Sequence, residues 1–174
     1  MLRYNRKSSW NVEMMFVPSI AALLELEGGI ICLKNVSGDT TNLSFLAAGG
    51  GPTFKCKLPL SASHISPIGF RQRTKIYLAD SFKNKELTRA DFLGPCICIE
   101  SCFSAIAGYA FSAIFSGIHG MNMEDFLTTA TDLIDVNSQH FLLFLNHANA
   151  AIVTRQLFGP TAGVGGSILL GKIF

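Results

Sequence analysis

A long stretch without charge in the middle of the chain limits most strongly what the chain can fold into. Between Phe92 and Met121 the one charged side chain is Glu100, and residues 101–118 carry no charge at all. An uncharged stretch of this length reaches the lower end of what a membrane-spanning helix requires. The stretch is therefore expected either to be buried in a compact domain or to contact lipid.

The same stretch has two periodicities, which predict different structures. As a helix it would present a stripe of small residues, typical of closely packed membrane helices: Ser104, Gly108, Ser112 and Ser116. As strands it would place bulky residues on one face and small ones on the other, as in the wall of a closed barrel. Residues 96–102 follow a proline and alternate, which predicts a strand. For residues 103–118 both alternatives stay open, and the strand signals upstream favour strands.

Strand signals dominate the first half of the chain. Residues 29–36 and 40–46 are rich in β-forming residues, and Ser37-Gly38-Asp39 between them predicts a hairpin. Residues 53–58 alternate between apolar and basic side chains, and residues 75–79 form another short β-prone segment. The stretch from Gly49 to Pro52 predicts a loop or a sharp bend.

Beyond Gly120 the spacing of apolar residues becomes helical. Asn122 can cap a helix over 123–136, and a second, almost entirely apolar helix is expected over 138–158. The glycine-rich apolar tail after it would be a flexible end, a membrane-inserting end or a last strand. The sequence thus predicts the α+β class: an antiparallel Gly-rich β-sheet or barrel over about 20–118, two apolar helices and the tail.

Charge is distributed unevenly along this expected single domain, residues 1–174. The basic part, about 20–90, contains a segment, 55–89, with eight basic and two acidic residues, whereas the apolar part, about 92–174, is mildly acidic. A basic surface of this kind attracts anionic lipid headgroups. The phosphate or headgroup contacts expected are Arg71, Arg73 and Lys75. For this segment a solvated β-surface is the favoured interpretation, a membrane surface comes second and a nucleic-acid backbone ranks last.

Catalytic motifs are not evident. Gly166 to Lys172 matches the start of a phosphate-binding loop, but Ile173 stands where a magnesium-binding hydroxyl is needed. His140 and His147 are seven residues apart without a third ligand, so no metal and no cofactor is expected. Glu100 differs from its surroundings, because a carboxylate in an apolar stretch needs a partner or a function. Glu100, Gly108 and Ser112 are the expected ligand- or pore-lining residues.

Three functions follow from these features. The favoured one is a non-enzymatic, membrane-associating protein, in which the basic β-region docks, the apolar half inserts or oligomerises, and membrane perturbation is an extension. The alternative is a soluble Gly-rich β-barrel that binds an apolar ligand or a protein partner, and an enzyme ranks third. Glu13 and Pro18 interrupt the N-terminal apolar run, so a cleaved signal peptide is not expected. The expected location is the membrane, or otherwise the cytoplasm.

Overall fold

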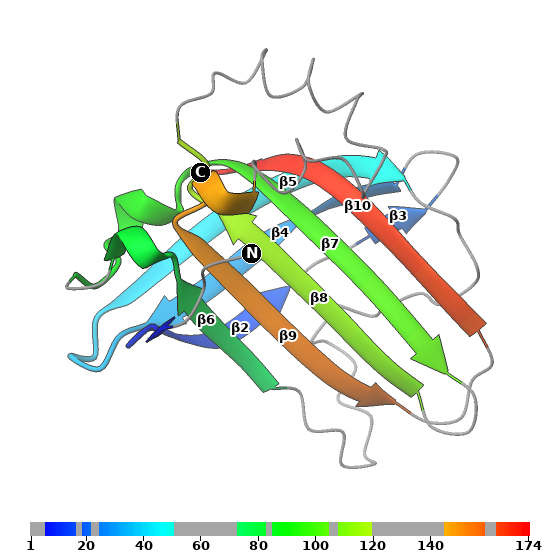
Figure 1. Ribbon diagram of the computed structural model, residues 1–174, viewed down its shortest axis with the longest axis horizontal. Helices are drawn as coiled ribbons and strands as arrows, with labels where there is room; N and C mark the ends of the chain where they lie inside the picture. The colour runs from blue at the N-terminus through cyan, green and yellow to red at the C-terminus, as the bar shows by residue number, and fades with distance from the viewer. Residues whose placement is uncertain are drawn as a thin grey trace.

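The computed structural model describes residues 6–16, 19–21, 25–50, 73–82, 85–104, 108–119, 145–158 and 163–174. These residues are mostly β-strand (Figure 1). The strands are β1 (Arg6–Lys7), β2 (Asn11–Phe16), β3 (Ser19–Ala21), β4 (Glu25–Lys34), β5 (Thr40–Gly50), β6 (Arg73–Leu78), β7 (Gly94–Ser104), β8 (Gly108–Ser116), β9 (Ala150–Phe158) and β10 (Gly163–Ile173). Two 3-10 helices, η1 (Asp80–Phe82) and η2 (Arg89–Phe92), lie between β6 and β7.

The strands form one antiparallel sheet in the order β1-β6-β9-β8-β7-β10-β5-β4-β2, with β3 also paired to β4. β1 and β2 stand at opposite ends of this order, although only residues 8–10 separate them in the chain. β2 also contacts β6, and the Ser8 amide donates to the Ile76 carbonyl at 2.8 Å. The sheet therefore curls into a half-barrel whose two ends approach each other at the N-terminal segment (Figure 1).

The inner face of the curled sheet holds the main apolar core. Its buried side chains come from β4 to β10 and from η2, and include Ile31, Leu43, Phe45, Ile76, Phe92, Ile114, Ile152 and Leu169. Trp10 closes one end of this core, with its ring edge-on to Phe92 and its Nε1 donating to the Leu87 carbonyl at 2.7 Å. Apolar burial on this scale is the main source of the fold's stability.

Several sequence predictions are confirmed. The predicted hairpin is β4–β5, and Gly38 in its turn has a φ of 91°, a conformation that glycine adopts without strain. The strand predicted over 75–79 is β6, and the one over 96–102 belongs to β7. Of the two alternatives for 103–118, strands are correct: among the described residues, 103–104 end β7 and 108–116 form β8.

The predicted α+β class is wrong, because the described part of the chain is mostly antiparallel sheet with almost no helix. Of the helix predicted over 138–158, residues 145–147 form one helical turn and 150–158 are strand β9. β9 lies between β6 and β8 and carries β-branched residues at 152–154, which favour a strand. The helix predicted over 123–136 and the strand predicted over 53–58 lie outside the described residues. The tail is a strand, β10, in the middle of the sheet.

The loop predicted from Gly49 onward is also partly wrong, since Gly49 and Gly50 end strand β5 and pair with β10. A Cβ atom on Gly49 would lie 2.2 Å from the Ile168 carbonyl oxygen. Glycine here allows two strands to approach closely, which is one of its established uses inside a strand.

Candidate functional site

A row of polar side chains crosses the inner face of the half-barrel over five neighbouring strands. Glu100 of β7 lies opposite both Ser112 of β8 and Ser167 of β10. Ser112 lies in turn opposite Thr154 of β9, and Thr154 opposite Thr74 of β6. Directly opposed residues in a sheet point to the same face. We call these five residues the polar row: Ser167, Glu100, Ser112, Thr154 and Thr74.

The polar row is largely shielded from water. Ser112 and Thr154 are each 3% exposed, and the Oε1 atom of Glu100 is buried. The hydroxyl oxygens of Thr74 and Thr154 lie 3.2 Å apart, within hydrogen-bonding distance. A buried carboxylate is costly unless polar groups surround it, and the hydroxyl-bearing Ser112 and Ser167 flank Glu100 on both neighbouring strands. The row therefore offers an acceptor and several hydroxyls to a polar group inside an otherwise apolar interior.

The polar row directly borders the packed core. Two residues along each strand, the same face carries apolar or thiol side chains, all of them buried: Leu169, Cys98, Ile114, Ile152 and Ile76. These five side chains and the polar row are separated along the strands by one repeat of the pleat, a distance of about 7 Å. The polar row therefore lies at one level of the half-barrel, directly beside a level of buried apolar and thiol side chains.

Most of the described residues on the outer face of β7–β10 are apolar. Its buried residues from β7, β8 and β9 form a second cluster with Ile118, Leu145 and Ala148: Ile97, Ala113, Phe115 and Ala151. Five partly buried residues extend it over β7 to β10: Ile99, Phe111, Val153, Ile168 and Leu170. We call the outer side of β7–β10 the apolar wall; its strands thus carry large apolar residues outside and several small or polar residues inside.

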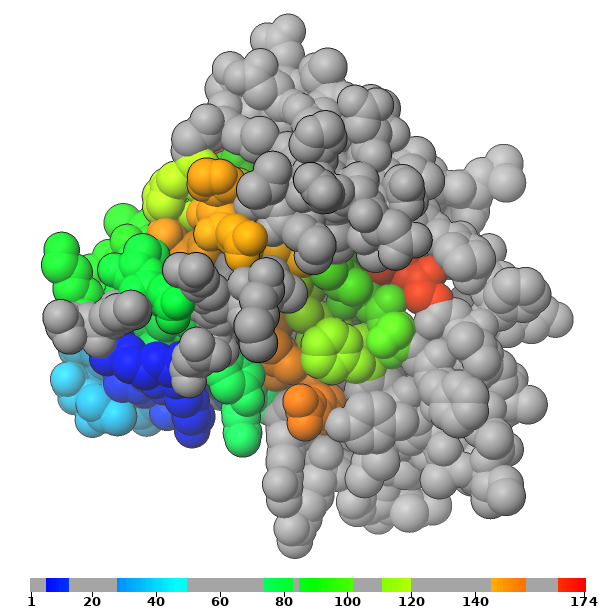
Figure 2. Space-filling model, viewed as in Figure 1, coloured from blue at the N-terminus to red at the C-terminus, as the bar shows by residue number. Residues whose placement is uncertain are grey.

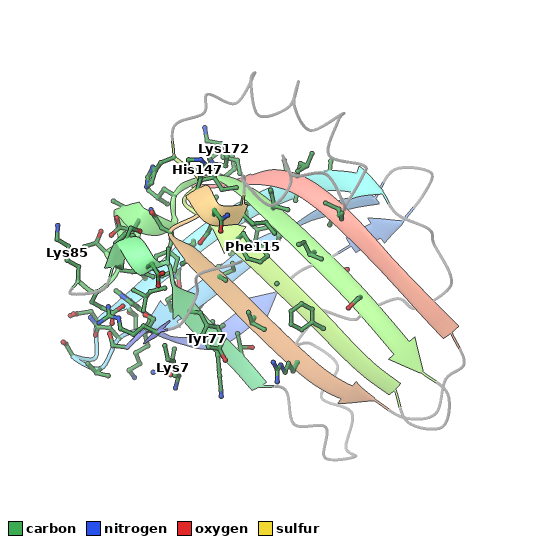
Figure 3. All side chains as sticks on the ribbon, in the orientation of Figure 1. Lys7, Tyr77, Lys85, Phe115, His147 and Lys172 are labelled. Atoms are coloured by element: carbon green, nitrogen blue, oxygen red, sulfur yellow. The ribbon has the colours of Figure 1, made fainter. Side chains whose placement is uncertain are left out.

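A group of basic side chains lies on the outer face beside the apolar wall. Lys75 of β6 is exposed and lies opposite Val153, and Arg155 of β9 is exposed and lies opposite Phe111. Lys7 of β1 lies opposite Tyr77 of β6, and Figure 3 shows these two side chains close together. We call Lys7, Lys75, Tyr77 and Arg155 the basic patch.

The residues expected from the sequence are distributed over these features. Glu100 and Ser112 are brought together as direct neighbours in the polar row. Gly108 lies on the same strand as Ser112 but four residues away, about 13 Å along a strand. Lys75 belongs to the basic patch, and the backbone of Arg73 pairs with Arg155. Arg71 lies outside the described residues.

Sequence reasoning missed Thr154, Thr74 and Ser167, which complete the polar row. Thr154 was expected in a helix and Ser167 in a tail of undecided structure. Thr74 precedes a segment that was expected to be a strand, and its spacing of two residues from Ile76 could have placed it on the same face as Ile76. No signal in the sequence shows that these three residues would join Glu100 and Ser112 in one row across the sheet.

A second polar cluster closes one end of the half-barrel. The Asn149 side-chain amide donates to the Asp91 carbonyl at 3.0 Å and also contacts Nε2 of His119. Gly117 lies beneath it with a φ of 66°, and a Cβ atom there would meet the Asp91 carbonyl oxygen at 2.0 Å. His147 is exposed, and the described residues contain no group of three or more His, Cys, Asp or Glu that could hold a metal ion. This cluster ties β8, β9 and η2 together and is structural.

Comparison with known proteins gives one informative similarity. Over 109 residues the chain is 28% identical to the toxin protein Tse4 of Pseudomonas aeruginosa. The chain resembles a bacterial toxin. The matched region covers 56% of this chain and 56% of that protein, so the chain spans little more than half the length of this relative. No protein-family model matches the chain, and no solved structure matches it.

None of the helices in the described part of the chain has the length and hydrophobicity needed to cross a membrane.

Proposed function

We propose that this protein is a toxin that associates with membranes and perturbs them through its β-sheet, without catalysing a reaction. The observation that carries the proposal is the apolar wall, whose strands turn large apolar residues outward and the polar row inward. This is the alternation of strands that cross bilayers. The similarity to a protein described as a toxin supports the toxin part of the proposal independently.

The dimensions of the wall fit this function. β7 and β10 have 11 residues each, and β8 and β9 have 9. A tilted strand needs about 9–11 residues to cross the hydrocarbon core of a bilayer. The four strands are also neighbours in the sheet, in the order β9-β8-β7-β10, so they would present one largely apolar surface to lipid, with Arg155 and Lys172 as its charged residues among those described.

Insertion would require a change from the conformation described here. Ile118, Leu145 and Ala148 are buried against the apolar wall, and the inner core is packed with aliphatic side chains. The present conformation is therefore that of a folded protein before insertion, with part of its lipid-binding surface covered. On this proposal Ile118, Leu145 and Ala148 move away from the apolar wall when the wall enters lipid.

The test is release of a fluorescent dye from sealed phospholipid vesicles by the purified protein. Dye release that grows with protein concentration is the expected result, and retention of the protein on the vesicles after an alkaline-carbonate wash should accompany it. Intact vesicles, together with complete recovery of the protein in the supernatant, would contradict the proposal.

The packed inner core supports one second candidate, a folded β-domain that binds a partner protein. A well-packed interior on both sides of β7–β9 would serve such a domain equally well. That function predicts no dye release and no vesicle binding, so the same experiment separates the two.

A further inference from the structure

We infer that the basic patch is the surface with which this protein first docks on an anionic lipid bilayer. The inference rests on the proposed membrane function and adds to it the headgroup chemistry and the residues that recognise it. The partner is a bilayer containing lipids with negatively charged headgroups, and the docking face is the outer side of β1, β6 and β9.

The strand register is the first argument. Lys7 lies opposite Tyr77, Lys75 opposite Val153, and Arg155 opposite the backbone of Arg73. Diagonal neighbours on adjacent strands are about 7–8 Å apart. Lys75 and Arg155 stand in this relation, as do Lys7 and Lys75. Three strands that are distant in the sequence thus contribute positive charges to one small area of the outer face.

The absence of negative charge on this face is the second argument. The outer-face positions described on β1, β6, β9 and β8 contain no acidic residue: Lys7, Lys75, Tyr77, Ala151, Val153, Arg155, Phe111, Ala113 and Phe115. The nearby carboxylate of Glu86 is engaged elsewhere, because it accepts hydrogen bonds from the Ser8 hydroxyl and the Ser9 amide. The patch therefore keeps its positive charge, which is complementary to anionic headgroups.

The continuity of the patch with the apolar wall is the third argument. Arg155 lies opposite Phe111 and Lys75 opposite Val153, so each charge adjoins a partly buried apolar residue of the wall. Figure 2 shows atoms of β1, β6 and β9, in blue, green and orange, on the same face of the molecule. Tyr77 is half-buried among these residues, and tyrosine is favoured at the level of lipid headgroups. Docking here would place the apolar wall beside the bilayer, ready to enter it.

The experiment measures the partition of the full chain onto vesicles of phosphatidylcholine, with and without phosphatidylserine. In Lys75→Gln/Arg155→Gln two positive charges of the patch are removed. Binding to the anionic vesicles is expected to weaken about thirtyfold, since each Lys or Arg near an anionic surface contributes roughly a factor of five. Added salt should weaken wild-type binding and narrow this difference.

The matched control is Lys85→Gln/Arg89→Gln, which removes the same net charge from two exposed positions outside the basic patch and the apolar wall; Figure 3 shows Lys85 away from Lys7 and Tyr77. It should bind anionic vesicles about as well as the wild type. The two single variants, Lys75→Gln and Arg155→Gln, should each lose about fivefold, which keeps the test valid if the double variant folds poorly. Thermal unfolding of every variant verifies the fold.

Two outcomes would overturn the inference. One is equal binding of the wild type to neutral and anionic vesicles. The other is unchanged vesicle binding by the double variant; if its affinity for single-stranded DNA fell instead, the patch would be a nucleic-acid surface. Dye release is scored separately, so anionic binding through the patch without release would count against membrane perturbation while leaving docking intact.

Discussion

Glu100 combines a charged group with a position on the inner face, flanked by Ser112 and Ser167. Glu100→Gln keeps the shape of the side chain and removes its charge. We expect the free energy of unfolding to change by less than about 1 kcal/mol, because the amide can still hydrogen-bond. On the proposed function the carboxylate holds a polar group during insertion, so Glu100→Gln removes one charge-assisted hydrogen bond. Dye release should therefore fall about tenfold. The control is Ser101→Ala, on the opposite face of β7. Dye release by Glu100→Gln equal to that of the wild type would mean that Glu100 has only a structural role.

Glu86 gives the fold a dependence on pH. Partial burial raises the pKa of its carboxyl, but hydrogen bonds from the Ser9 and Leu87 amides and the Ser8 hydroxyl outweigh burial and bring the pKa below its ordinary value of 4.5. A lowered pKa stabilises the fold above pH 4.5, and that stability is lost as the pH falls through the folded-state pKa. The melting temperature should therefore fall less steeply in Glu86→Gln than in the wild type between about pH 5 and pH 2. Parallel curves for the two proteins would contradict this assignment.

The sequence predicts part of the candidate site because some of its features are local. The contrast between Glu100 and its apolar neighbours is visible without a structure, and alternation along β7 and β8 assigns Glu100 and Ser112 each to one face of its strand. Thr154 and Ser167 join them only through the order of strands in the sheet. That order depends on contacts between distant segments, which one sequence does not reveal.

At the level of elements, β9 shows why a strand was mistaken for a helix. Ile152 points to the inner core, while Ala151 and Val153 point to the apolar wall. A strand buried on both faces loses the alternation that identifies strands and reads as a continuous apolar run. The hairpin β4–β5 was predicted correctly because its signal, a glycine turn between two β-prone runs, is local.

Gly171 tests how closely β10 and β5 must approach. It lies opposite Ala47, and a Cβ atom there would stand 2.2 Å from the Leu46 carbonyl oxygen and 2.6 Å from the Ala47 Cβ. Gly171→Ala should destabilise the fold by about 1–3 kcal/mol in urea unfolding, since the backbone would have to move. Val36→Ala is the control: its side chain is 80% exposed, and the substitution should change the free energy of unfolding by less than about 0.5 kcal/mol. A Gly171→Ala protein as stable as the control would show that the two strands separate easily.

At the scale of the molecule, the N-terminal segment connects the two ends of the sheet. β1 pairs with β6 at one end and β2 pairs with β4 at the other, with Trp10 buried between them. Strands that are far apart in the sheet order are thus held together by a short connection, in addition to the core that they share. This closure should make the half-barrel unfold as one cooperative unit.

Trp10 provides the test, because it is the one tryptophan of the chain. Its indole contacts Phe92 edge-on and donates to the Leu87 carbonyl, so truncation removes both packing and a hydrogen bond. Trp10→Ala should lower the free energy of unfolding by about 3–5 kcal/mol, whereas Asn11→Ala, at an exposed neighbour, should change it by less than about 0.5 kcal/mol. In the wild type, urea transitions followed by Trp10 fluorescence and by far-UV circular dichroism should coincide. A fluorescence transition at lower urea would mean that the N-terminal closure opens first, and the same opening could then precede insertion of the apolar wall.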